Sequence, residues 1–232
     1  SYGQTDDIPY CLLINVTAGK EINEFKERIY GGINLSTGHT IPGIGYSYLS
    51  AGLSTFFNGR HTEQGLLLLR TSYFSNLNYI GNYRIRNFVK IDYTRGFDRY
   101  SDEFLSIVKE HGFSGFSNDS TMGNQRLSIN LETVVFSPLN FYGFRFAFFS
   151  YADLGFLFGT NQNVGEGDFV SSIGVGIRIR NNNLLFNTFQ IRIGFFPNLP
   201  EHSRINYLRF SGEELLKPYN FESGPPSILL YK

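Results

Sequence analysis

The stretch Arg126–Val135, with the sequence RLSINLETVV, alternates between two kinds of side chain. Apolar or β-branched residues take every second position from Leu127 to Val135, and polar or charged residues take the positions between them up to Glu132. Successive side chains of a β-strand point to opposite faces, so this stretch is predicted to be a strand with one apolar and one polar face.

The same alternation recurs in Ser172–Arg180 and in Thr188–Phe195. These segments run to about ten residues, which suits a tilted strand crossing roughly 30 Å of hydrocarbon, whereas strands of soluble proteins cluster near about five or six. A soluble β-sandwich would also alternate, but the polar registers here carry several arginines, as expected of the polar lumen of an outer-membrane barrel. These arginines are Arg84, Arg86, Arg145, Arg178, Arg180 and Arg192. We therefore favour an all-β fold, a transmembrane antiparallel β-barrel, over a sandwich.

Composition agrees with this interpretation. Aromatic residues make up 17% of the 232 residues, and because Trp is absent, the 15 Tyr and 24 Phe would have to form the interfacial girdles. The sequence contains no run of 18 or more apolar residues, which excludes a helical membrane protein. The 20 basic and 20 acidic residues balance without a basic stripe, so nucleic acid is not an expected partner.

About ten strands are predicted from the alternation and the turn residues. They are Tyr10–Thr17, Glu27–Ser36, Gly45–Phe57, Gln64–Phe74, Tyr83–Thr94, Gln125–Phe136, Gly143–Phe158, Phe169–Arg180, Leu185–Phe196 and Pro226–Tyr231. We expect one outer-membrane β-barrel domain over residues 1–232, incomplete at its N-terminus. The chain opens without an initiator Met or a signal segment, which suggests a mature protein or a fragment.

Short and long connections are predicted to alternate, as in barrels with tight periplasmic turns and longer outer loops. Ser137–Asn140 and Asn181–Asn183 are the expected tight links. The expected long connections are Arg95–Asn124, Gly159–Asp168 and Pro197–Gly224.

Several ordered motifs resemble the BamA/TamA-like surface-antigen superfamily of outer-membrane assembly factors and two-partner secretion transporters, in a version typical of Bacteroidota. The inward-folded loop of that family, and the strand that follows it, are resembled by Gly112–Ser117, Gly123–Leu127 and Asn130–Glu132. Phe149–Gly155 resembles the aspartate-bearing strand of that family, and Gly174–Arg178 resembles its glycine-rich penultimate region.

This resemblance implies a barrel of sixteen strands, of which this chain would hold the C-terminal ten. It also implies that the connection Arg95–Asn124 folds into the lumen with Ser114, Gly115 and Phe116 at its tip. In the family an arginine stands at the position of Ser114 and pairs with acidic groups of the lumen wall.

The acidic residues that would receive such an arginine, Glu132 and Asp153, are both present on polar registers. A buried carboxylate without a cation is costly, so another donor is required. Arg145 shares a face with Asp153 and is the substitute that the sequence offers. Absence of the loop arginine puts insertase or translocase activity in doubt.

No catalytic residue, cofactor or metal site is expected, and the protein is not expected to be an enzyme. Cys11 is the only cysteine, no Gly-x-Ser-x-Gly motif occurs, and the four histidines are scattered. A Ser, His and acid triad assembled from distant segments stays open.

Three functional hypotheses remain for the cell outer membrane of a Gram-negative bacterium. The first is outer-membrane protein assembly or protein and lipid translocation, with membrane lipid and client outer-membrane proteins or partner subunits as partners. The second is a structural barrel that anchors an upstream domain or partner complex, which Ser114 favours. The third is a passive pore or an outer-membrane enzyme.

Overall fold

The computed structural model describes residues 10–24, 26–107, 116–117, 122–159, 162, 166–181, 188–200, 203–212 and 227–231. All regular structure in these residues is β. Among them, no helix has the length and apolar character needed to span a membrane.

Nine long strands form most of the structure. They are β1 (Cys11–Ile22), β2 (Glu27–Ile41), β3 (Gly45–Asn58), β4 (His61–Ser75), β6 (Tyr83–Phe97), β8 (Gln125–Phe141), β9 (Phe144–Phe158), β10 (Asp168–Arg180) and β11 (Thr188–Asn198). The shorter strands are β5 (Asn78–Ile80), β7 (Phe116–Ser117), β12 (Arg204–Ile205) and β13 (Leu208–Gly212).

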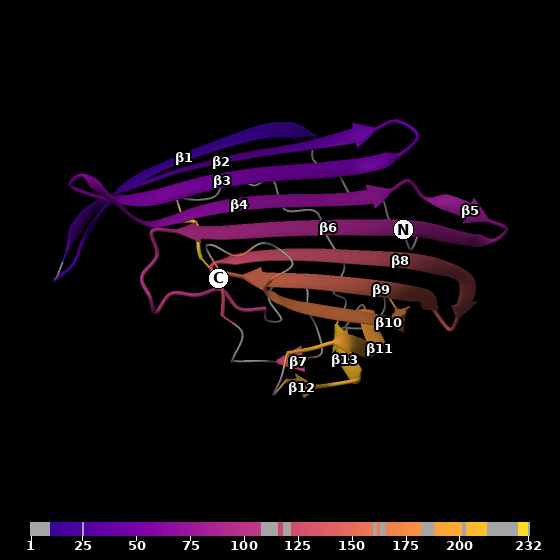
Figure 1. Cartoon of the computed structure of the whole chain (residues 1–232). Coiled ribbons are helices and arrows are strands. Elements are labelled where there is room, and N and C mark those ends of the chain that lie inside the picture. Colours follow the sequence, from indigo (N-terminus) through magenta and orange to yellow (C-terminus); the bar gives the residue numbers. More distant parts are fainter. Residues whose placement is uncertain are drawn as a thin grey trace.

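The long strands and β13 form one curved sheet in the order β1-β2-β3-β4-β6-β8-β9-β10-β11-β13 (Figure 1). Every neighbouring pair is antiparallel, β5 adds to β6, and β7 pairs with β12 in a separate two-stranded sheet. Within the described residues β1 and β13 are the two ends of this order, so the sheet does not close on itself. The prediction of an all-β antiparallel sheet is confirmed.

The two faces of the sheet are inverted relative to a soluble protein. One face, which we call the inner face, carries buried polar side chains, including Asn130, Glu132, Asp153, Ser172, Arg178, Gln190 and Arg192. The opposite or outer face exposes large apolar side chains, including Ile33, Leu53, Leu131, Phe148, Val175, Ile193 and Phe195. The alternation in the sequence therefore separates a face with buried polar side chains from a face with exposed apolar ones.

The hairpin between β8 and β9 turns later than predicted. Ser137–Asn140 lies inside β8, where the register with β9 shifts between Phe136 and Asn140, and the turn falls at Tyr142 and Gly143. Both turn residues have positive φ, 48° and 82°, which is the pattern of the two-residue turns that match the twist of a hairpin. The residues Ser137–Asn140 form an irregularity in the strand instead of a turn.

The expected last strand, Pro226–Tyr231, is corrected by the structure. Residues 227–231 form no strand, and β13 takes the place next to β11 within the expected long connection Pro197–Gly224. The side chains of Leu229 and Tyr231 are instead half-buried and pack against the inner face of the sheet. The second expected tight link retains only Asn181 among the described residues, since 182 and 183 lie outside them.

The connection between β6 and β8 folds over the inner face in its described part. Leu105 and Ile107 are fully buried against inner-face side chains of β9, β10 and β11. The Leu105 amide donates to the Gly123 carbonyl at 2.7 Å, and Arg126 on β8 donates to the Ser106 carbonyl at 2.8 Å. This connection and the one between β9 and β10 leave the same end of the antiparallel sheet.

Candidate functional site on the inner face

The most buried charges of the inner face are paired with each other. Arg178 on β10 donates two hydrogen bonds to Glu132 on β8, at 3.0 and 2.7 Å, and is 0% exposed. Its Nε donates to Gln190 Oε1 at 3.0 Å, and its guanidinium lies 4.2 Å from the ring centroid of Phe149. A planar guanidinium matches a carboxylate in this two-bond geometry, so the pair links β8 to β10 across the intervening β9.

Asp153 has a different set of partners. Its carboxylate accepts hydrogen bonds from Asn130 on β8 at 2.8 Å and from Ser172 on β10 at 3.1 Å. All three side chains are buried, so neutral donors from both neighbouring strands hold this carboxylate in place. Arg192 on β11 stacks over the nearby Tyr151 ring at 4.4 Å and adds positive charge to the same region.

Arg145 does not stand beside Asp153. The two residues lie eight positions apart on β9, which corresponds to roughly 26 Å along an extended strand. Arg145 pairs in register with Asn140 and Arg180 near the turn end of the sheet. The cation that pairs with Glu132 is Arg178, and not Arg145 as the sequence suggested.

The predicted loop tip is described only in part. Ser114 and Gly115 lie outside the described residues. The backbone of Phe116 belongs to β7, where it pairs with Ile205 of β12. The interaction of the loop tip, Ser114 to Phe116, with Glu132 and Asp153 therefore remains a prediction.

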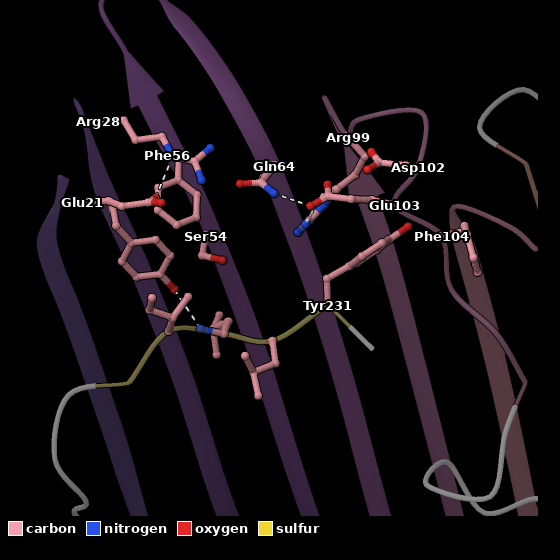
Figure 2. A pocket seen from close by; sticks show the side chains of 14 residues that line it. Glu21, Arg28, Ser54, Phe56, Gln64, Arg99, Asp102, Glu103, Phe104 and Tyr231 are labelled. Carbon is pink, nitrogen blue, oxygen red and sulfur yellow. Dashed lines mark hydrogen bonds and ion pairs between the residues drawn. The ribbon is translucent and has the colours of Figure 1, made fainter. Parts of the chain in front are cut away.

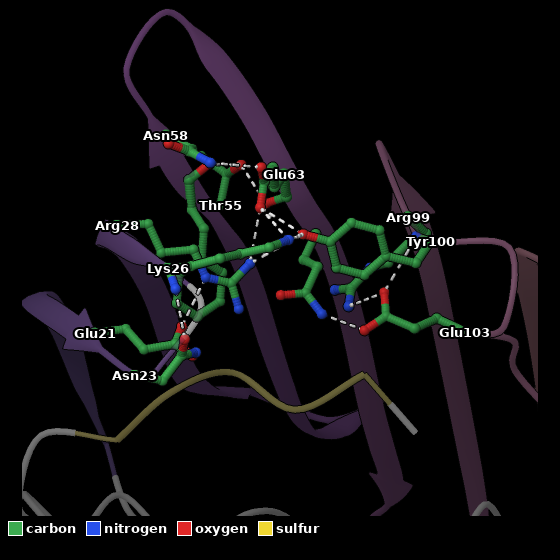
Figure 3. A network of polar contacts seen from close by, with 12 residues as sticks. Glu21, Asn23, Lys26, Arg28, Thr55, Asn58, Glu63, Arg99, Tyr100 and Glu103 are labelled. Atoms are coloured by element: carbon green, nitrogen blue, oxygen red, sulfur yellow. Dashed lines mark hydrogen bonds and ion pairs between the residues drawn. The ribbon is translucent and has the colours of Figure 1, made fainter.

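A second polar network lies at the other side of the sheet, near the end from which the long connections leave (Figure 3). Arg28 on β2 donates to Glu21 at 2.7 Å and to Glu63 on β4 at 3.1 Å. The Tyr100 hydroxyl donates to the same Glu63 oxygen and accepts from Lys26 at 2.6 Å. The hydrogen bond to Tyr100 raises the pKa of Lys26, which lies in the β1–β2 turn.

Residues 227–231 cross the inner face over β2–β6, seen as the olive ribbon in Figure 2. The amide of Leu229 donates to the hydroxyl of Tyr30 at 2.9 Å. The Tyr231 ring lies 4.0 Å from the guanidinium of Arg99, and burial raises the pKa of Tyr231 to about 12. We call residues 227–231 the C-terminal strap.

A cavity of about 460 Å³ opens between the strap and the sheet. Its lining combines Glu21, Arg28, Gln64, Arg99 and Glu103 with apolar side chains of the strap. Gln64 donates to Glu103, which also accepts from Arg99 at 3.4 Å. Burial lowers the pKa of Arg99, yet this carboxylate beside it favours the charged form.

Metal ligands do not gather in this site. Within the described part of the chain, no three His, Cys, Asp or Glu side chains are placed to hold a metal ion. The arrangement is suited to recognising charged and aromatic groups by hydrogen bonds, ion pairs and stacking.

Sequence reasoning found the acids but missed most of their partners. Arg178 was identified only as one of several arginines on a polar register, and no sequence signal separates it from Arg180. The strap was missed because its alternating apolar residues are those of a terminal strand. Glycines at 52 and 96, on inner-face registers opposite the strap, are the signal that points to a close approach. Comparison with protein-family models and with curated proteins finds no match to this chain.

Proposed function

We propose that this chain is part of a transmembrane β-barrel of the BamA/TamA-like superfamily, in the outer membrane of a Gram-negative bacterium. Its proposed role is outer-membrane protein assembly or protein and lipid translocation. The observation that carries the proposal is the inversion of the two faces, with Arg178 and Glu132 buried inside while Val175 and Ile193 are exposed outside.

An exposed apolar face of this extent is unfavourable in water, because each large side chain left exposed forgoes about 1.5–3 kcal/mol of burial. Hydrocarbon around the outer face removes that cost. A soluble sandwich would instead place a second layer there, and in the described residues nothing covers the exposed side chains of Leu131 and Phe195.

The lengths of the strands fit a bilayer. The nine long strands have 11 to 17 residues. At about 3.3 Å per residue and a tilt of about 45°, these lengths span roughly 26–40 Å along the membrane normal. Backbone groups at a sheet edge must be paired in hydrocarbon, so the edges at β1 and β13 would each need a partner strand in the membrane.

The contents of the inner face favour a filled lumen over an open pore. The described part of the β6–β8 connection and the strap both cover it, at Leu105, Ile107 and Tyr231. This agrees with the inward connection that the resemblance implies. The anchoring function is the second candidate, favoured by Ser114 at the position of the family arginine.

Membrane insertion is testable because the chain contains no Trp. Single tryptophans are introduced on the outer face, as Leu131→Trp and Val175→Trp, and on the inner face as Tyr48→Trp. In vesicles containing brominated lipid, we expect the two outer tryptophans to be quenched and the inner one to be unaffected. Equal quenching of tryptophan fluorescence in all three variants would contradict the membrane proposal.

The assembly role is tested separately in vesicles that contain the protein. An unfolded eight-stranded outer-membrane protein is added, and its folded fraction is followed by heat-dependent gel mobility. We expect faster folding than in vesicles without the protein. An unchanged folding rate with intact insertion would favour the anchoring function, and steady ion conductance would favour the pore.

A further inference from the structure

Two glycines of the inner face leave room for side chains of the C-terminal strap. We call the position of Leu229 against Gly52 and that of Tyr231 against Gly96 the two seats of the strap. A Cβ atom built on Gly96 of β6 would lie 2.7–2.8 Å from the Cε2, Cζ and hydroxyl oxygen atoms of Tyr231, and these are its three nearest neighbours. A Cβ on Gly52 of β3 would lie 3.1 Å from Leu229 Cδ1. Neither glycine has a positive φ, so the lack of a side chain, and not an unusual backbone, is what these positions supply.

The strap is bound through alternate side chains. Leu229 and Tyr231 face the sheet, whereas Ile228 and Leu230 are more than half exposed. This alternation is typical of an extended peptide that contacts a surface with every second side chain. Its main chain makes one hydrogen bond to the sheet among the described residues, from Leu229 to Tyr30.

Tyr231 makes more kinds of contact than the other residues of the strap. Arg99 stacks over one side of the ring at 4.0 Å, and Tyr231 also packs on the buried cluster that includes Leu105 and Ile107. The Tyr231 hydroxyl is buried and has no hydrogen-bond partner within the described structure. The seat therefore recognises the aromatic ring and not the hydroxyl.

We propose that the inner face of β2–β6 is a binding groove for an extended peptide with an aliphatic residue followed two positions later by an aromatic one, and that the C-terminal strap is its resident, displaceable occupant. The groove holds such a peptide by ring stacking on Arg99, contact with Gly52 and Gly96, and one hydrogen bond to Tyr30. This inference does not depend on the proposed function, because the contacts are the same whatever surrounds the outer face.

The test uses a fluorescein-labelled peptide of sequence SILLYK, identical to residues 227–232. Binding is measured by fluorescence anisotropy to the intact chain and to a variant that ends before Ser227. We expect saturable binding to the shortened chain, and at least tenfold weaker binding to the intact chain because the strap competes. Lack of saturable binding to a shortened chain that folds would overturn the proposal.

Peptide variants define the aromatic seat. Replacing the tyrosine of the peptide by alanine should weaken binding at least tenfold. Replacing it by phenylalanine should leave binding equal or tighter, since it removes a buried hydroxyl that has no partner. Loss of binding with phenylalanine would contradict recognition by the ring.

Gly96→Ala in the intact chain keeps the proposal testable if the shortened chain does not fold. The added methyl group should displace Tyr231, so carboxypeptidase should remove residues 231 and 232 at least fivefold faster than from the unchanged protein. Gly19→Ala is the matched control, because nothing lies within 4 Å of a Cβ at Gly19 on β1. Equal digestion of the two variants would show that the strap does not occupy this seat.

Discussion

Glu132→Gln is predicted to destabilise the fold strongly although it changes only one atom type. Arg178 is 0% exposed and directs two hydrogen bonds at the Glu132 carboxylate, at 3.0 and 2.7 Å. An amide at position 132 offers one oxygen and places an NH2 group against a guanidinium that can only donate. The substitution therefore leaves a buried cation with one bond lost and no opposite charge.

The size of the effect follows from the burial of the pair. Removing one partner of a buried ion pair costs about 3–5 kcal/mol, because the remaining charge stays out of water. Arg178→Met should cost a similar amount by leaving Glu132 unpaired. The double variant carries no charge at either of these two positions, and its main defects are the buried amide at position 132 and the orphaned Gln190 oxygen that Arg178 now satisfies, each worth about 1–3 kcal/mol.

The assay is a double-mutant cycle in urea, with the folded fraction read from heat-dependent gel mobility and β-sheet circular dichroism. The combined loss should fall below the sum of the single losses by at least about 3 kcal/mol, with an unchanged dependence on urea. Glu27→Gln is the matched control, because the Lys20–Glu27 pair has the same 2.7 Å distance but both side chains are more than half exposed. That control should lose less than about 1 kcal/mol. Additive losses, or equal effects of Glu132→Gln and Glu27→Gln, would refute the reasoning.

Three further predictions concern packing, the turn and orientation. Gly176→Ala should cost about 1–3 kcal/mol in urea unfolding, because its Cβ would lie 2.3 Å from an aromatic ring and 2.5 Å from a backbone carbonyl, whereas Gly19→Ala should be neutral or slightly stabilising. Tyr142→Asn should stabilise the β8–β9 hairpin by up to about 1 kcal/mol in the same assay, since asparagine tolerates the positive φ at this exposed turn; a loss of stability would contradict this. If the end of the sheet opposite the long connections faces the periplasm, a membrane-impermeant maleimide should leave Cys11 unlabelled on intact cells but label Asp102→Cys in a Cys11→Ser background, and the opposite result would invert the orientation.

The strands were predictable because each carries its own signal. Alternation over ten or more residues fixes both the strand and the face that each side chain takes, and nine of the ten expected strands occur. The turn at Tyr142 and Gly143 was missed because Ser137, Pro138 and Asn140 have stronger turn propensity. There the antiparallel pairing with β9 outweighs local preference, at the cost of an irregular register.

Pairing between distant side chains was much less predictable. Glu132 was expected on the inner face, and the register alone decides that Arg178, two strands away, reaches it. The strap failed as a predicted strand for a related reason, since alternation at Leu229 and Tyr231 fits an extended peptide on a surface as well as it fits a ladder. Periodicity specifies which side a residue faces but not what it contacts.

The two halves of the inner face are held by different interactions, and this difference explains where a peptide can bind. Across β8–β10, the bridges from Arg178 to Glu132 and from Asp153 to Asn130 and Ser172 tie each strand to the others through buried side chains. Across β3–β6, glycines at 52 and 96 leave the backbone open, and the strap supplies the apolar contacts that side chains of the sheet do not. A ligand on the first half would have to break buried ion pairs, whereas one on the second half only exchanges with the strap. Displacing the strap should therefore alter the second half while the Glu132–Arg178 pair persists.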